Sequence, residues 1–145
     1  VWMSEVVHLL GDVSSWVKHL ALITKPGGRI LIRTSTHEQL KEREWYRYFP
    51  TALHVDLARH PTKDSILKNL AKTGFTNISI TTVDESRLIP TQLLLGMIQA
   101  KSFSTLHFIG DSEFHKGFSM LCSQSDGKIE SLWHYEMTAY TATFQ

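Results

Sequence analysis

The sequence predicts an α/β protein in which helices cover a largely parallel sheet. Residues 1–3 are apolar like the end of a buried strand, and residues 13–23 carry apolar side chains at helical spacing. Pro26-Gly27-Gly28 then interrupts the helix, and the apolar run Ile30-Leu31-Ile32 follows. Consecutive apolar positions are typical of a parallel strand covered on both faces, so these segments predict one right-handed βαβ unit.

The start and end of the first helix are visible in the sequence. Asp12 is a candidate N-cap, because a carboxylate can accept hydrogen bonds from the free N–H groups of the first turn. The predicted buried stripe consists of Val13, Trp16, Leu20 and Ile23. A glycine that takes the left-handed backbone closes such a helix, which is the role we expect for Gly27-Gly28.

The remaining segments alternate helices and strands around two insertions. A second helix is expected from Thr62 or Asp64 to Gly74, followed by a strand through Ile78 and Ile80. Helical patterns return at about 91–103 and from Asp111, and alternating residues from Trp133 to Ala139 predict the last strand. We therefore expect residues 1–145 to form a single partial domain with insertions at about 36–61 and about 90–124, the first of them irregular.

Composition limits the classes of function. The chain has 145 residues, 42% of them hydrophobic and 20% charged, which is enough for a folded core. The formal net charge is +1, so we expect neither a nucleic-acid nor an anionic-membrane partner. One cysteine, no secretory signal and no long apolar run predict a reducing, cytoplasmic location without a membrane span.

Two further chemistries find no support in the sequence. The group His54, Asp56, Arg59 and His60 has no standard zinc-ligand spacing, so no metal site is expected. A Gly-x-Ser-x-Gly elbow for serine hydrolysis is also absent.

The amino-acid sequence of the βαβ unit resembles the second half of a class I S-adenosylmethionine (SAM)-dependent methyltransferase of the small-molecule type. The segment 2–10, Trp-Met-Ser-Glu-Val-Val-His-Leu-Leu, is similar to the end of the family's fourth strand and the loop after it. Lys25-Pro26-Gly27-Gly28 and the strand after it are similar to the turn into the fifth strand. The resemblance implies that 74–80 lead into strand six, and that 133–144 form an antiparallel strand seven between strands five and six.

The resemblance also implies that the first half of the fold is missing. In the family, a glycine-rich loop after the first strand and an acidic residue after the second hold SAM. Gly27-Gly28 follow a helix instead of a strand, so they do not replace that loop. We therefore interpret Val1 as an internal position of a longer protein, and we expect this chain alone to bind SAM weakly or not at all and to be inactive.

The family pattern, carried onto the end of the first strand, predicts cofactor and catalytic residues. Met3, Ser4 and Glu5 are expected to contact the amino-acid part of SAM, Met3 and Ser4 mostly through their backbone; Glu5 is equally well explained as a surface acid. His8 is the candidate general base, since a histidine at a strand's carboxyl end can accept a proton near neutral pH. The alternative is a histidine that only shapes the pocket.

Candidate substrate residues follow the second strand and lie in the first insertion. Arg33 and Thr34 lie at the same edge of the sheet, where Arg33 could bind a carboxylate, or could simply be solvated. Tyr46 and Tyr48 belong to an aromatic cluster with Trp45 and Phe49 that would form either a dry substrate lid or a small core.

Three hypotheses about function remain open. The first is an enzyme, the C-terminal portion of a methyltransferase that acts on a small molecule and needs its N-terminal half. The second is a non-catalytic methyltransferase-like domain used for protein interaction or dimerisation, and the third is an unrelated α/β domain. Loss of the first strands would leave a strand edge and apolar surface bare, so the chain alone is expected to form a homodimer or a higher assembly.

Overall fold

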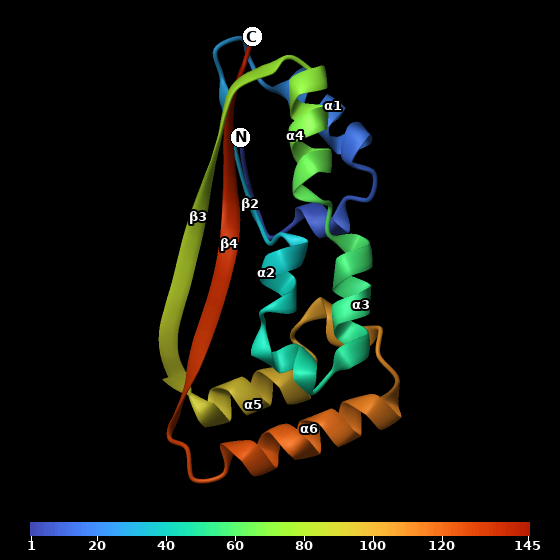
Figure 1. The fold of residues 1–145 in the computed structure, drawn as a ribbon, viewed down its shortest axis with the longest axis vertical. Coiled ribbons are helices and arrows are strands. Elements are labelled where there is room, and N and C mark those ends of the chain that lie inside the picture. Colours follow the sequence, from blue (N-terminus) through green and yellow to red (C-terminus); the bar gives the residue numbers. More distant parts are fainter. The chain divides into compact units, whose positions relative to one another are not determined.

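Four strands form one mixed sheet in the order β1-β2-β4-β3. The computed structural model describes all 145 residues and assigns β1 to Trp2–Ser4, β2 to Arg29–Thr34, β3 to Phe75–Pro90 and β4 to Glu130–Phe144 (Figure 1). β1 pairs with β2 in parallel, and β2 pairs with β4 in antiparallel register, with Leu31 opposite Thr141. The expectation that the last strand runs antiparallel between the two strands before it is confirmed.

The chain divides into two compact units. The first comprises residues 1–40, 57–84 and 136–145, and the second comprises residues 41–56 and 85–135. The second unit overlaps both expected insertions. β3 and β4 are long strands that contribute residues to both units. Each is longer than the strand that its alternating apolar pattern predicted.

Helix α1, Val13–Ile23, forms the predicted crossover of the βαβ unit. Asp12 caps it as expected, since its Oδ2 accepts a hydrogen bond from Ser15 N at 2.8 Å. Gly27 takes a φ of +76° in the turn that follows the helix. Its N–H donates to Phe144 O at 2.8 Å, which fastens the turn to the end of β4.

The core of the first unit lies between one face of the sheet and two helices. Helix α4, Lys63–Lys72, is capped by the Thr62 hydroxyl and lies beside α1 on the same side of the sheet (Figure 1). The buried apolar residues of this core are Val7, Trp16, Val17, Leu20, Ile30, Ile32, Ile66, Leu70, Phe75, Tyr140 and Ala142. Ile23, expected in the buried stripe of α1, is exposed at the last residue of the helix, and Val17 is buried there instead.

The segment 36–61, expected to be irregular, is helical. It forms α2 at His37–Lys41, the 3-10 helix η2 at Glu44–Arg47 and α3 at Pro50–Arg59. Its aromatic and charged residues obscured the helical period, because the buried positions of α3 are only Ala52 and Asp56. A search for regularly spaced apolar residues does not register an aspartate at a core position.

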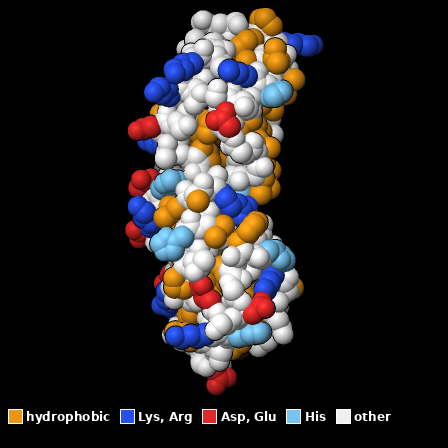
Figure 2. Space-filling view, turned by 90° about the vertical axis from the view of Figure 1, so that its right-hand side faces the viewer, with side chains coloured by type: hydrophobic (Ala, Val, Ile, Leu, Met, Phe, Trp, Pro, Cys, Tyr) orange, Lys and Arg blue, Asp and Glu red, His pale blue; other side chains and the backbone are white.

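The second insertion lies within residues 85–135 of the second unit. It contains α5 at Thr91–Gln99, η3 at Ser104–His107 and α6 at Asp111–Ser125, in agreement with the helical patterns read from the sequence. None of the α-helices is long and apolar enough to cross a bilayer. On the face that Figure 2 shows, basic and acidic side chains are interspersed, without a large patch of one sign.

Candidate functional site at the carboxyl ends of β1 and β2

The parallel pairing of β1 and β2 brings several of the predicted site residues together. Ser4 lies opposite Arg33 in the register, and Arg33 Nε donates a hydrogen bond to Ser4 Oγ at 2.9 Å. The next residue, Glu5, donates its N–H to Arg33 O at 2.9 Å and takes a φ of +52°. A left-handed backbone is uncommon for glutamate and marks a sharp turn where the chain leaves the strand.

Met3 and Thr34 point to the other face of the sheet. Met3 packs against the core beneath α1 and α4, so it can meet a ligand above the strand end only through its backbone. Thr34 is 1% exposed, and its Oγ1 has no hydrogen-bond partner within the chain. A buried hydroxyl without a partner is rare and costly, so Thr34 is an unusual polar position in the core.

His8 follows this strand end in the chain and belongs to the 3-10 helix η1, Val7–Leu9. Its ring stacks on the ring of His60, with centroids 4.4 Å apart and ring planes 20° apart. His60, in the loop after α3, is 6% exposed, and its carbonyl accepts a hydrogen bond from His37 Nε2 at 2.9 Å. The pair could not be predicted from the sequence, because the two histidines are 52 positions apart and meet only where the α3–α4 loop packs against η1.

Tyr46 and Tyr48 are buried in the second unit. The Tyr46 hydroxyl donates to Asp56 Oδ2 at 2.6 Å, and burial, followed by this bond, raises the Tyr46 pKa well above its ordinary value. The Tyr48 hydroxyl donates to Gln124 Oε1 at 2.6 Å. Trp45 stacks on Tyr46 with a centroid distance of 4.2 Å. Because both hydroxyls are bonded within the unit, the arrangement favours the small-core interpretation over the lid.

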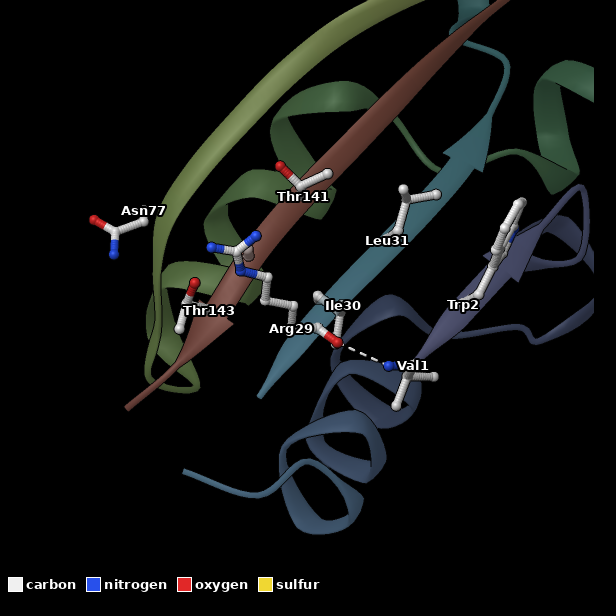
Figure 3. Close-up of a pocket in the computed structure, with 9 residues that line it drawn as sticks. Val1, Trp2, Arg29, Ile30, Leu31, Asn77, Thr141 and Thr143 are labelled. Carbon is white, nitrogen blue, oxygen red and sulfur yellow. Dashed lines mark hydrogen bonds between the residues drawn. The ribbon is translucent and has the colours of Figure 1, made fainter. Parts of the chain in front are cut away.

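A hollow of about 780 Å³ lies on the face of the first unit's sheet opposite its core. Figure 3 shows Trp2, Leu31 and Thr141 projecting into it from three neighbouring strands. Its other lining residues are Val1, Arg29, Ile30, Asn77, Ala142 and Thr143. The hollow extends toward the amino end of β2 and does not include Ser4 or Arg33. Sequence reasoning missed it, because it expected helices on both faces of the strand.

The two adjacent glycines of the first turn lie away from the strand-end residues. The adjacent glycines, Gly27 and Gly28, lie at the amino end of β2, opposite the edge that holds Ser4 and Arg33. Both glycines are hydrogen-bonded to Phe144 within the sheet. A Cβ on Gly28 would lie 2.7 Å from Lys25 O, so this turn is built for close backbone packing. The two glycines therefore shape the turn before β2 and do not join the strand-end residues.

The structure brings no set of candidate metal ligands together. No group of three or more histidine, cysteine, aspartate or glutamate side chains could hold an ion. The stacked pair of His8 and His60 lacks the third ligand that a zinc site would need.

Comparison with known proteins supports the fold. No protein-family model matches the chain, and no curated protein matches it. Among solved structures, a candidate methyltransferase from Bacillus halodurans aligns with a TM-score of 0.55 at 15% identity, covering 99% of this chain and 62% of that one. Phosphoethanolamine N-methyltransferase 2 of Haemonchus contortus, solved with S-adenosyl-L-methionine, aligns with a TM-score of 0.51 at 14% identity, covering 99% of this chain and 32% of that one.

These similarities define a class of fold. The chain has a methyltransferase-like α/β fold, with the four-stranded mixed sheet described above. It spans about a third to three fifths of the length of these two structures.

Proposed function

We propose that these 145 residues are the C-terminal portion of a SAM-dependent methyltransferase that acts on a small molecule. The observation that carries the proposal is the strand order β1-β2-β4-β3, with the antiparallel β4 inserted beside β2. This order is the one implied by the methyltransferase resemblance, and an unrelated α/β domain has no reason to reproduce it. Polar residues cluster at the carboxyl ends of the strands, where open α/β sheets bind their ligands.

Each predicted residue has a distinct part in this proposal. Ser4 and Glu5, with the backbone of Met3, form one rim of the cofactor site. His8 accepts the proton that the methyl acceptor loses, and Arg33 contacts the acceptor, whereas the buried Thr34 supports the same strand end from the core face. Tyr46 and Tyr48 pack within the second unit, where both hydroxyls are hydrogen-bonded. The alignment of the acceptor and the exclusion of water require the opposite rim.

The opposite rim is proposed to come from the N-terminal portion of a complete methyltransferase domain. Parallel strands are normally covered on both faces, whereas only one face of β1 and β2 is covered by α1 and α4. β1 is an edge strand, and exposed apolar side chains occur at it and on the elements that follow it: Val1, Trp2, Leu9, Leu10, Leu22 and Ile23. An open strand edge with exposed apolar side chains is typical of a surface that pairs with further polypeptide.

Calorimetry with SAM tests the proposal. The complete gene product that contains these residues is expected to bind SAM, whereas the 145-residue chain is expected to give little or no heat. A His8→Gln change in the complete protein is expected to lower methyl transfer by about a hundredfold or more, while SAM affinity stays unchanged. Absence of any SAM binding by the complete gene product would overturn the enzyme proposal.

A second candidate function is a non-catalytic interaction domain. The same exposed apolar side chains favour it, because they would serve a protein partner without any cofactor. Stable association of the complete gene product with no SAM binding would support this alternative.

A further inference from the structure

The ring of His8 stacks on the ring of His60. The stacking distance of 4.4 Å and the angle of 20° leave the two imidazoles nearly parallel. His8 belongs to η1 after β1, and His60 belongs to the loop between α3 and α4. Both residues lie in the first unit, so the contact is a feature of one compact body.

We propose that His60 is a positioning residue for His8, fixing the orientation of its ring and opposing a second positive charge on the stacked pair. The catalytic consequence rests on the proposed function. The geometry of the pair and its coupled proton binding are independent of the proposed function.

The structure holds His60 itself from several directions. Its carbonyl accepts a hydrogen bond from His37 Nε2, so this nitrogen of His37 must carry a proton. Pro61 restricts the backbone of His60, and Thr62 is fixed as the N-cap of α4. His60 is buried, whereas His8 is only partly buried. The backbone of the loop is therefore held in place, and the buried ring of His60 stacks on the more accessible ring of His8.

Stacking has an electrostatic consequence. Two imidazolium rings at this separation repel each other in a partly buried site, so the pair takes up its second proton only at lower pH than its first. The charged or titratable residues along these elements include Glu5 before η1, His37 and Glu38 in α2, Arg59 at the end of α3, and Lys63 and Asp64 at the start of α4. Because the arrangement resists double protonation, it favours a neutral ring that can accept a proton near neutral pH.

Nuclear magnetic resonance of the imidazoles in the 145-residue chain tests the proposal without any activity. Between about pH 5 and about pH 9, the two rings are expected to titrate as a coupled pair, with midpoints separated by about one unit or more. His60→Phe keeps a ring against His8 but removes the second charge, so His8 is expected to titrate in a single step at higher pH. His60→Ala is expected to abolish the upfield ring-current shift of the His8 protons.

Two further variants control the experiment. His54→Phe makes the same change at an exposed histidine of α3 and is expected to leave the His8 titration unchanged. Glu5→Gln separates the effect of the nearby carboxylate from that of His60. An identical His8 titration in the wild type and in His60→Phe would overturn the charge argument. An unchanged His8 ring-current shift in His60→Ala would overturn the stacking argument.

Kinetics of the complete protein then separate positioning from the proposed function. His60→Ala is expected to lower kcat by about tenfold to a hundredfold with unchanged SAM affinity, because the base loses its orientation. His60→Phe is expected to retain most of kcat and to shift the acidic limb of the pH profile upward. A coupled titration in a protein that neither binds SAM nor transfers methyl groups would leave the His60 inference standing and remove the proposed function.

Discussion

The Tyr46 hydroxyl donates a hydrogen bond of 2.6 Å to Asp56 Oδ2 within the second unit. The other carboxylate oxygen, Oδ1, accepts a bond of 2.7 Å from the Thr105 hydroxyl. Asp56 is only 5% exposed, so both bonds compensate for the loss of water around its oxygens. Tyr46 and Asp56 come from residues 41–56, and Thr105 comes from residues 85–135, so this buried carboxylate joins the two segments of the unit.

Removal of the Tyr46 hydroxyl should destabilise the protein. Tyr46→Phe keeps the ring but leaves a buried carboxylate oxygen without this donor, and the expected loss is about 1–3 kcal/mol in the free energy of unfolding. Urea denaturation measures it. Tyr48→Phe is the matched control, because its hydroxyl bonds to Gln124 in a less buried setting and should cost less. Equal stability of Tyr46→Phe and the wild type would show that the bond contributes nothing.

Alkaline pH should weaken the folded state through two tyrosines. Burial, and then the bond to Asp56, raises the pKa of Tyr46, and burial, followed by Glu38 and Asp64, raises the pKa of Tyr140 to about 12. Their pKa in the unfolded chain is about 10, so above that pH the unfolded state releases these protons first. Stability is therefore fully present below about pH 10 and falls as pH rises toward 12.

Denaturation midpoints measured at about pH 9 and about pH 11 check this expectation. The fall between the two values should shrink in Tyr140→Phe, because phenylalanine has no proton to lose. A midpoint that does not fall over this range would contradict the assignment.

Gly117 should tolerate no side chain. A Cβ at this position of α6 would lie 2.1 Å from Tyr48 O and 2.7 Å from the Phe49 ring, and backbone and ring leave no room for it. Gly117→Ala should therefore lower the thermal midpoint by several degrees or prevent folding. Gly96→Ala in α5 is the control, because nothing lies within 4 Å of its Cβ. Alanine favours the helix there, so this variant should be as stable as the wild type or more stable.

The parts of the structure that the sequence predicted are those that local rules govern. Asp12 as a cap, Gly27 in the turn and a strand through Ile30 and Ile32 depend on neighbours within a few residues, and all are present. The contact between His8 and His60 and the bond between Tyr46 and Asp56 depend on how separate segments fold back. Asp56 was read as part of a polar group, because composition alone does not distinguish a buried carboxylate from a solvated one.

The open face of the first unit should make the isolated chain self-associate. Trp2 is 72% exposed on an edge strand and lines the hollow together with Leu31 and Thr141. In a pure solution, a second copy of the chain offers the apolar surface that can cover it. Light scattering at high protein concentration should give a mass of at least twice the 16.6 kDa of the monomer. Trp2→Lys should shift the population toward monomer, because an ammonium group is costly to bury against apolar surface.

The same change at Ile129, which is 86% exposed in the second unit, provides the matched control. Ile129→Lys should leave the mass unchanged if association uses the β1 edge and the open face of the sheet. If both lysine variants lower the mass equally, association depends on general surface hydrophobicity instead. A clean monomer for the wild type would show that the exposed edge of β1 does not drive pairing, and the surface would then have no support as an interface.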